Sequence, residues 1–208
     1  MAIKRNQEEL NKKLLMSCFI GDTVGVSSAI ARGAVIDPVL VLRDAAGAGH
    51  AHILRLLKEN GVDVAKYGAA ALVVAAQNGE IECVDLLLRN GVDANTDDNA
   101  AINAAAGNCQ TLVVDRLIMS GAKTDKALSI AVFWLLANEG MDGEEGYRNV
   151  VDCLVANQAN IRAARAMLIG DIKGCGDQNM ENKVKASGLW NELAGAQSSV
   201  SRTNSMNY

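Results

Sequence analysis

The sequence predicts an all-α fold built from stacked helical repeats, and three observations support this. Glycine pairs twelve residues apart recur at Gly21–Gly33, Gly49–Gly61 and Gly79–Gly91. The positions that close successive units fall at residues 33, 61, 91, 121 and 158, in steps of 28, 30, 30 and 37 residues. Half of the residues are apolar but only 3% are aromatic, so alanine and leucine must fill the core. A period of about 20 to 50 residues is typical of repeat proteins, because one short helix pair cannot bury its own apolar face.

The clearest unit occupies residues 71–95. An alanine-rich run, residues 71–77, stops at the Asn-Gly turn 78–79, and an amphipathic run, residues 81–89, stops at the Asn-Gly turn 90–91. The spacing fits helices of about two to three turns. Glycine adopts the left-handed conformation that ends a helix at little steric cost. The unit is therefore predicted to be an antiparallel helix pair.

This unit reads AAQNGEIECVDLLLRNGVDAN, and more divergent copies read AGAGHAHILRLLKENGVDV, AAGNCQTLVVDRLIMSGAKTD and CFIGDTVGVSSAIARGAVID. The pattern resembles the ankyrin repeat over residues 14–161. The resemblance implies an ankyrin-like helical repeat solenoid that binds a partner protein in a concave groove and has no enzymatic activity. The family's Thr-Pro-Leu-His helix start is absent and the steps are about three residues short. We therefore expect shortened hairpins between repeats.

These patterns divide the chain into successive segments. Residues 1–13 are polar and are predicted to form an N-terminal helical cap that extends the first repeat. About five repeats follow, with boundaries at 14–37, 38–65, 66–95, 96–125 and 126–161. Residues 162–208 are predicted to form a helical C-terminal cap that ends in a flexible Ser/Asn-rich tail.

The fifth repeat differs from the others because an insert, at 137–147, separates its two helices. The insert is rich in glycine and acidic residues, and we expect it to leave the stack as a projecting loop. Phe133 and Trp134 come just before it and are two of the seven aromatic residues in the chain.

The repeat pattern fades after residue 161. Residues 162–169 are predicted to form one more helix, and the glycine-punctuated segment 170–177 (GDIKGCGD) a loop. Apolar positions within 181–193 predict a short helix. The Ser/Asn-rich segment 196–208 is predicted to be mobile.

The charge distribution favours a protein partner over nucleic acid. The net charge is −4, but residues 14–161 alone carry 10 basic and 18 acidic side chains. Nucleic acid must be neutralised by lysine and arginine. An acidic body instead favours a partner protein with a basic or mixed surface.

The remaining composition predicts a cytoplasmic protein that does not enter a membrane. The longest apolar run, residues 127–137, is too short to span a bilayer, which needs about 20 residues. The N-terminal segment lacks the apolar core of a signal peptide. Five cysteines without a CxxC motif indicate a reducing compartment. A monomer is favoured over an oligomer.

No catalytic, cofactor or metal site is predicted. His50 and His52 are the only histidines, and the resemblance assigns them hydrogen bonds between loops. A closed metal site would need cysteine or histidine partners that the neighbouring sequence lacks. Segment 170–177 lacks the Gly-Lys-Ser/Thr ending of a phosphate loop and is predicted to be a bare turn. Cys175 has no histidine in local reach to activate its thiol.

The resemblance instead places candidate protein-binding residues at three kinds of position. Tips between repeats contribute Lys66, Tyr67, Asp97, Asp98 and Lys126, ends of first helices contribute Gln77, Asn78, Asn108, Phe133 and Trp134, and the insert contributes Tyr147. An aromatic side chain in a groove is typical of a binding hot spot. The alternative, that Phe133 and Trp134 pack beneath the insert, stays open.

Three functions are compatible with these features. The first is a protein-interaction module. Repeats this divergent resemble those of bacterial or viral ankyrin proteins, which implies an effector exported to a host cytosol. The second is a structural protein that self-associates through an exposed end of the stack. The third is an enzyme with its site in residues 162–208, a segment poor in acid–base groups.

Overall fold

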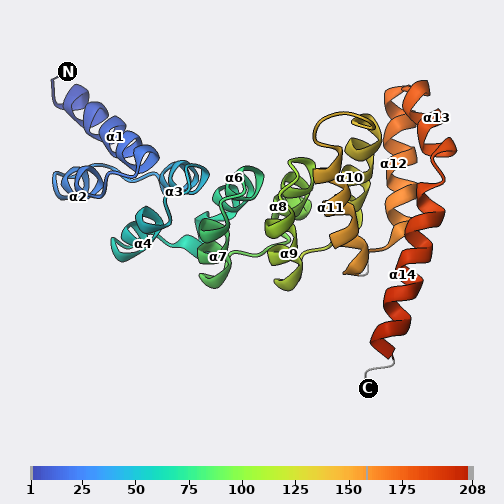
Figure 1. Ribbon diagram of the computed structural model, residues 1–208. Coiled ribbons are helices and arrows are strands. Elements are labelled where there is room, and N and C mark those ends of the chain that lie inside the picture. The colour runs from blue at the N-terminus through green and yellow to red at the C-terminus, as the bar shows by residue number, and fades with distance from the viewer. Residues whose placement is uncertain (1, 158, 206–208) are drawn as a thin grey trace. The chain divides into compact units, whose positions relative to one another are not determined.

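The computed structural model describes residues 2–157 and 159–205. The chain forms two compact units, Met1–Ala101 and Ile102–Tyr208. All regular elements in the described residues are helices, fourteen in number (Figure 1). The predicted all-α, ankyrin-like helical repeat is therefore confirmed.

The first unit contains seven complete helices. They are α1 (Ala2–Ile20), α2 (Thr23–Ala31), α3 (Pro38–Gly47), α4 (Ala51–Glu59), α5 (Val64–Tyr67), α6 (Ala69–Asn78) and α7 (Ile81–Arg89). Helix α8 (Thr96–Gly107) crosses the boundary between the units. The second unit contains α9 (Thr111–Met119), α10 (Asp125–Ala137), α11 (Glu144–Ala156), α12 (Ile161–Cys175), α13 (Gln178–Ala186) and α14 (Leu189–Ser205).

The first unit is a stack of helix pairs whose first helices, α1, α3 and α6, pack side by side. Small residues line these contacts, and all four alanines of the pairs 45–46 and 75–76 are fully buried. Gly47 allows the closest approach, because a β-carbon there would lie 2.6 Å from Cγ1 of Val74 on the next first helix. The alanine-rich sequence of the first helices is thus what permits their spacing.

Hydrogen bonds connect the second and third repeats to the repeats that precede them. Nε2 of His50 lies 3.0 Å from the Phe19 carbonyl oxygen, and Nε2 of His52 lies 3.1 Å from that of Gly21. A carbonyl oxygen only accepts, so Nε2 carries the proton in both rings. One repeat later, the Asn78 amide donates to the Gly47 carbonyl oxygen at 2.8 Å. The predicted structural role of the two histidines is confirmed.

No strand occurs among the described residues, so the expectation of short hairpins between repeats is wrong. Two of the tips are a short helix and a left-handed turn. Helix α5 occupies the tip of the third repeat, and the Asp63 carboxylate caps it by accepting from the Lys66 backbone N–H at 3.1 Å. At the next tip Asp97, Asp98 and Asn99 have φ values of 52°, 56° and 61°. Asp and Asn tolerate this left-handed region better than other residues with side chains.

The second unit ends in a three-helix cap. Helix α12 packs on α10, α13 packs on α12 and α10, and α14 packs on α11 and α12. Met180, Val184, Trp190 and Leu193 of the cap are buried. The Lys183 ammonium donates to the Leu136 carbonyl oxygen at the end of α10, at 3.0 Å. A cation at this position satisfies a free carbonyl at a helix C-terminus.

The C-terminal segment is more helical than its composition suggests. Helix α12 continues through the predicted 170–177 loop as far as Cys175 and ends at Gly176, whose φ is 71°. The predicted loop and bare turn are therefore wrong. The single helix expected in 181–193 is two helices, separated at Gly188 (φ 63°). The Ser/Asn-rich segment is helical as far as Ser205, whereas residues 206–208, like the closing position Gln158, lie outside the described residues.

The insert in the fifth repeat is shorter than predicted. Only residues 138–143 are non-helical, with Gly140 and Gly143 at positive φ, and α11 begins at Glu144. Tyr147 therefore stands on a helix and not in a loop. No helix in the described part of the chain is long and apolar enough to cross a membrane.

The packing at Gly47 makes a testable prediction. Gly47→Ala should lower the free energy of unfolding by about 1–3 kcal/mol, because the new methyl overlaps the stiff Val74 side chain. Gly170→Ala is the matched control, since its β-carbon meets nothing within 4 Å in α12, and should raise stability by up to about 1 kcal/mol. Urea unfolding of both variants tests the difference. Equal midpoints would contradict the close-packing argument.

Candidate protein-binding site

The ends of the first helices hold equivalent positions in every repeat, each following two small or buried residues. These pairs are Phe19-Ile20, Gly47-Ala48, Gln77-Asn78, Gly107-Asn108 and Phe133-Trp134. Gln77 and Asn78 are exposed, as is Asn108. The Asn78 amide, however, is bound to Gly47, and the Asn108 amide donates to the Ala104 carbonyl oxygen at 2.8 Å. The predicted asparagines thus hold the fold together as well as facing solvent.

The predicted tip residues lie on the surface of their own units. Lys66 is exposed, and its Nζ lies 4.9 Å from the centre of the half-buried Tyr67 ring, a cation–π contact. Asp97 and Asp98 are exposed in the left-handed turn. Lys126 is exposed in the first turn of α10.

The structure brings Phe133, Trp134 and Tyr147 together in an aromatic cluster. The rings of Trp134 and Tyr147 are stacked, with centres 6.2 Å apart and an interplanar angle of 16°. Phe133 meets Trp134 edge to face at 5.4 Å. Trp134 keeps 42% of its surface exposed, so it is not fully covered by its neighbours. The tryptophan packs on the helix that follows the insert and still faces solvent.

A hydrogen bond and close packing hold Tyr147 in place. Its hydroxyl donates to the Gly107 carbonyl oxygen at 3.2 Å. Gly146, the preceding residue, packs closely on Cys109. A β-carbon at position 146 would lie 3.1 Å from Cβ and Sγ of Cys109. Burial raises the pKa of the Tyr147 hydroxyl and of the Cys109 thiol, so both groups stay protonated at neutral pH. The protonated hydroxyl is the form that can donate.

Trp134 also borders a cleft of about 300 Å³ between α10 and α12. The cleft is mainly apolar and has two carboxylates in its lining. Its lining residues are Ser129, Ile130, Phe133, Trp134, Leu168, Asp171, Ile172, Cys175 and Asp177. The sequence prediction missed the α12 side because the glycines suggested a loop. The four-residue spacing of Leu168 and Ile172, both buried, is the helical signal that would have revealed it.

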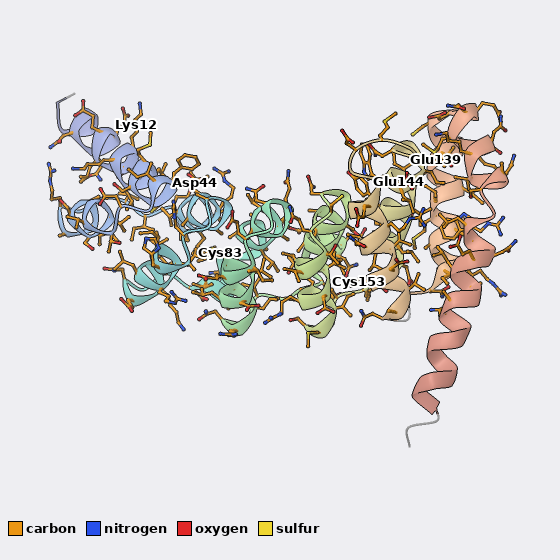
Figure 2. All side chains as sticks on the ribbon, viewed as in Figure 1. Lys12, Asp44, Cys83, Glu139, Glu144 and Cys153 are labelled. Atoms are coloured by element: carbon orange, nitrogen blue, oxygen red, sulfur yellow. The ribbon has the colours of Figure 1, made fainter. Side chains whose placement is uncertain are left out.

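Two acidic residues, Glu139 and Glu144, come shortly before Tyr147 in the chain. Figure 2 shows Glu139 and Glu144 at the same end of the α10–α11 pair. The Glu144 carboxylate accepts from the Gly140 backbone N–H at 2.7 Å and from Arg148 at 3.2 Å. These two bonds, the first more than the second, lower the pKa of Glu144. Glu144 is therefore a structural brace for the insert and stays ionised at neutral pH.

A second exposed apolar surface was missed in the first unit. Phe19 and Ile20 are each 57% exposed at the end of α1, and Met16 on the same helix is 54% exposed. Phe19 and Ile20 occupy the same repeat positions as Phe133 and Trp134. The residues before them are Ser17 and Cys18 rather than the two alanines of the middle repeats.

The described residues contain no cluster of histidine, cysteine, aspartate or glutamate that could hold a metal ion. The Cys18 and Cys83 thiols are buried, and that burial raises the pKa of each to about 12. Both are inert as nucleophiles at neutral pH.

The aromatic stack predicts a spectroscopic difference between two variants. In a Trp190→Phe background, which leaves Trp134 as the only tryptophan, Tyr147→Ala should shift the emission to longer wavelength because the indole loses its stacking partner. Tyr147→Phe keeps the ring and should leave the emission unchanged. It should lower the free energy of unfolding by about 0.5–1.5 kcal/mol, because the bond to Gly107 is lost. Identical emission from both variants would contradict the stacked arrangement.

Comparison with known families supports the repeat assignment. A family model described as ankyrin repeats in three copies matches residues 1–98 and, in a second register, residues 42–128. The search of curated proteins found no match. Together the two matches cover more than half of the chain, and the matched residues hold the helices from α1 to α9. The chain belongs to the ankyrin-repeat family, whose members are generally protein–protein interaction modules and typically not enzymes.

Proposed function

We propose that this protein is a non-enzymatic interaction module that holds a partner protein against the aromatic cluster of its second unit. The single observation that carries the proposal is Trp134, an aromatic side chain 42% exposed yet held in one orientation by Tyr147. Tryptophan and tyrosine are enriched at the energetic centres of protein interfaces. A side chain that is already ordered loses little conformational entropy on binding.

Charge indicates the kind of partner. Exposed acidic residues of the insert, Glu139 and Asp142, and Glu145 in the first turn of α11 lie close in sequence to the cluster. Such a surface attracts a partner with a basic or mixed surface and repels phosphate backbones. In the first unit, Lys66, Tyr67 and Gln77 are further proposed contacts, on a surface of their own.

The proposed setting is a cytoplasm, either that of the producing cell or that of a host into which the protein is exported as an effector. The cysteine usage supports a reducing compartment. All five cysteines are free thiols.

Affinity capture tests this function. A Tyr67→Ala/Trp134→Ala variant should bind partners captured by the wild type at least about 30-fold more weakly, because truncating a hot spot typically costs about 2 kcal/mol or more. The matched control is Leu112→Ala/Met119→Ala, which removes side chains that are 77% and 75% exposed on α9. Quantitative mass spectrometry of captured proteins gives the readout. Equal capture by the two double variants would contradict the proposal.

A second candidate function, self-association, is favoured by the exposed apolar end of α1. Surface patches of this kind on a soluble protein mark interaction sites. Under this alternative the mass measured by sedimentation equilibrium rises with concentration, and Phe19→Ser restores the monomer mass. A monomer mass at every concentration would eliminate it.

A further inference from the structure

The geometry points to a specific occupant for the cleft between α10 and α12: a partner segment that inserts one large apolar side chain and pairs a neighbouring lysine or arginine with Asp171. This inference rests on the proposed function and names the chemistry of the partner. It concerns a surface formed by the last repeat and the C-terminal cap.

The walls of the cleft come from two parallel rows of side chains. Helix α10 contributes Ile130, Phe133 and Trp134, and α12 contributes Leu168 and Ile172. At about 300 Å³, the space is at the small end of ligand sites, which range over about 300–1,000 Å³. It accommodates a single bulky side chain with part of its neighbour. The lining gives such a side chain apolar contact on both walls.

The charge at the rim decides what must accompany the apolar side chain. Asp171 is exposed on α12 beside the cleft and, among the described residues, makes no hydrogen bond or ion pair. Asp177 is already engaged, since its carboxylate accepts from the Met180 backbone N–H at 2.9 Å and caps α13. Asp171 is therefore the carboxylate left to meet a cation on the partner.

The nearby cations of this chain do not occupy that role. Lys183 donates to the Leu136 carbonyl oxygen and lies 3.8 Å from a Glu139 carboxylate oxygen. Residues three and four positions from Asp171 on its own helix are Met167, Leu168, Gly174 and Cys175, none of them basic. Asp171 is therefore available to pair with a lysine or arginine of the partner, beside the apolar cleft.

The cleft is also preformed. Trp134 is fixed by its stack on Tyr147, and Ile172 is buried in the packing of α12. Binding therefore orders mainly the incoming segment. The two carboxylates in the lining, Asp171 and Asp177, repel acidic peptides, phosphopeptides and nucleic acid, whose phosphates are not neutralised here. The occupant that fits both features is a peptide with a large apolar side chain for the walls of the cleft and a basic side chain for Asp171.

Peptide selection on the full chain tests the inference. A displayed library of random peptides is selected on the immobilised protein, and the enriched peptides are synthesised for affinity measurement. Enriched sequences should combine a large apolar residue with a lysine or arginine within one helical turn. Their affinity should fall at least about 30-fold for Trp134→Ala. It should fall several-fold for Asp171→Asn, which also removes most of the salt dependence. Met119→Ala should bind like the wild type.

Cys175 supplies an independent readout at the cleft. Its exposed thiol lines the cleft, so N-ethylmaleimide should label it in the native protein. A bound peptide should slow that labelling in the wild type and not in Trp134→Ala. A wild-type circular dichroism spectrum and a cooperative urea transition confirm that each variant is folded.

The outcomes separate the inference from the function beneath it. Enriched peptides that are acidic or neutral, or that bind Asp171→Asn as tightly as the wild type, contradict the proposed pairing of a partner cation with Asp171. Peptides that bind Trp134→Ala as tightly as the wild type and do not slow Cys175 labelling show that the cleft is not the binding site. Protein binding elsewhere on the chain would still be possible. If no peptide binds and affinity capture finds no Trp134-dependent partner, both proposals fall.

Discussion

The constraint on which this structure depends is that no helix pair can bury its own apolar face. Each pair must lie against a neighbour, and the small residues of the first helices make that approach possible. Hydrogen bonds then lock the spacing, through His50 and Asn78 in the first unit and Tyr147 in the second. An imidazole, an amide and a phenol perform one task, since each donates to a backbone carbonyl of the preceding repeat. The chemistry varies while the geometry is kept.

That lock has a consequence for recognition. A side chain on a helix that is held in place by its neighbours is presented in a fixed direction, so the proposed partner does not have to order it. Trp134 shows this most clearly, because Tyr147, whose hydroxyl donates to the Gly107 carbonyl oxygen, also stacks on the indole ring. The residues that hold the fourth and fifth repeats together are thus the same residues that shape the candidate site. Stability and binding depend here on shared contacts.

Much of the fold could be predicted from the sequence because the repeating glycine turns and alanine pairs are local signals. The rest depends on contacts that local reasoning cannot weigh. Gly170 and Gly174 suggested a loop, yet burial of Leu168 and Ile172 keeps α12 helical through them and creates one wall of the cleft. Tyr147 was placed in a loop because the start of α11 depends on the turn at Gly143. The candidate aromatic residues were identified, but their stacking required the structure.

Site-specific photocrosslinking measures the central claim most directly. A benzophenone side chain is introduced at position 134 in one sample and at position 119, on α9, in another, and both are irradiated in the cells that express the protein. The structure predicts a discrete crosslinked partner at position 134 and none at position 119. The same products from both positions, or a product from position 119 alone, would contradict the account.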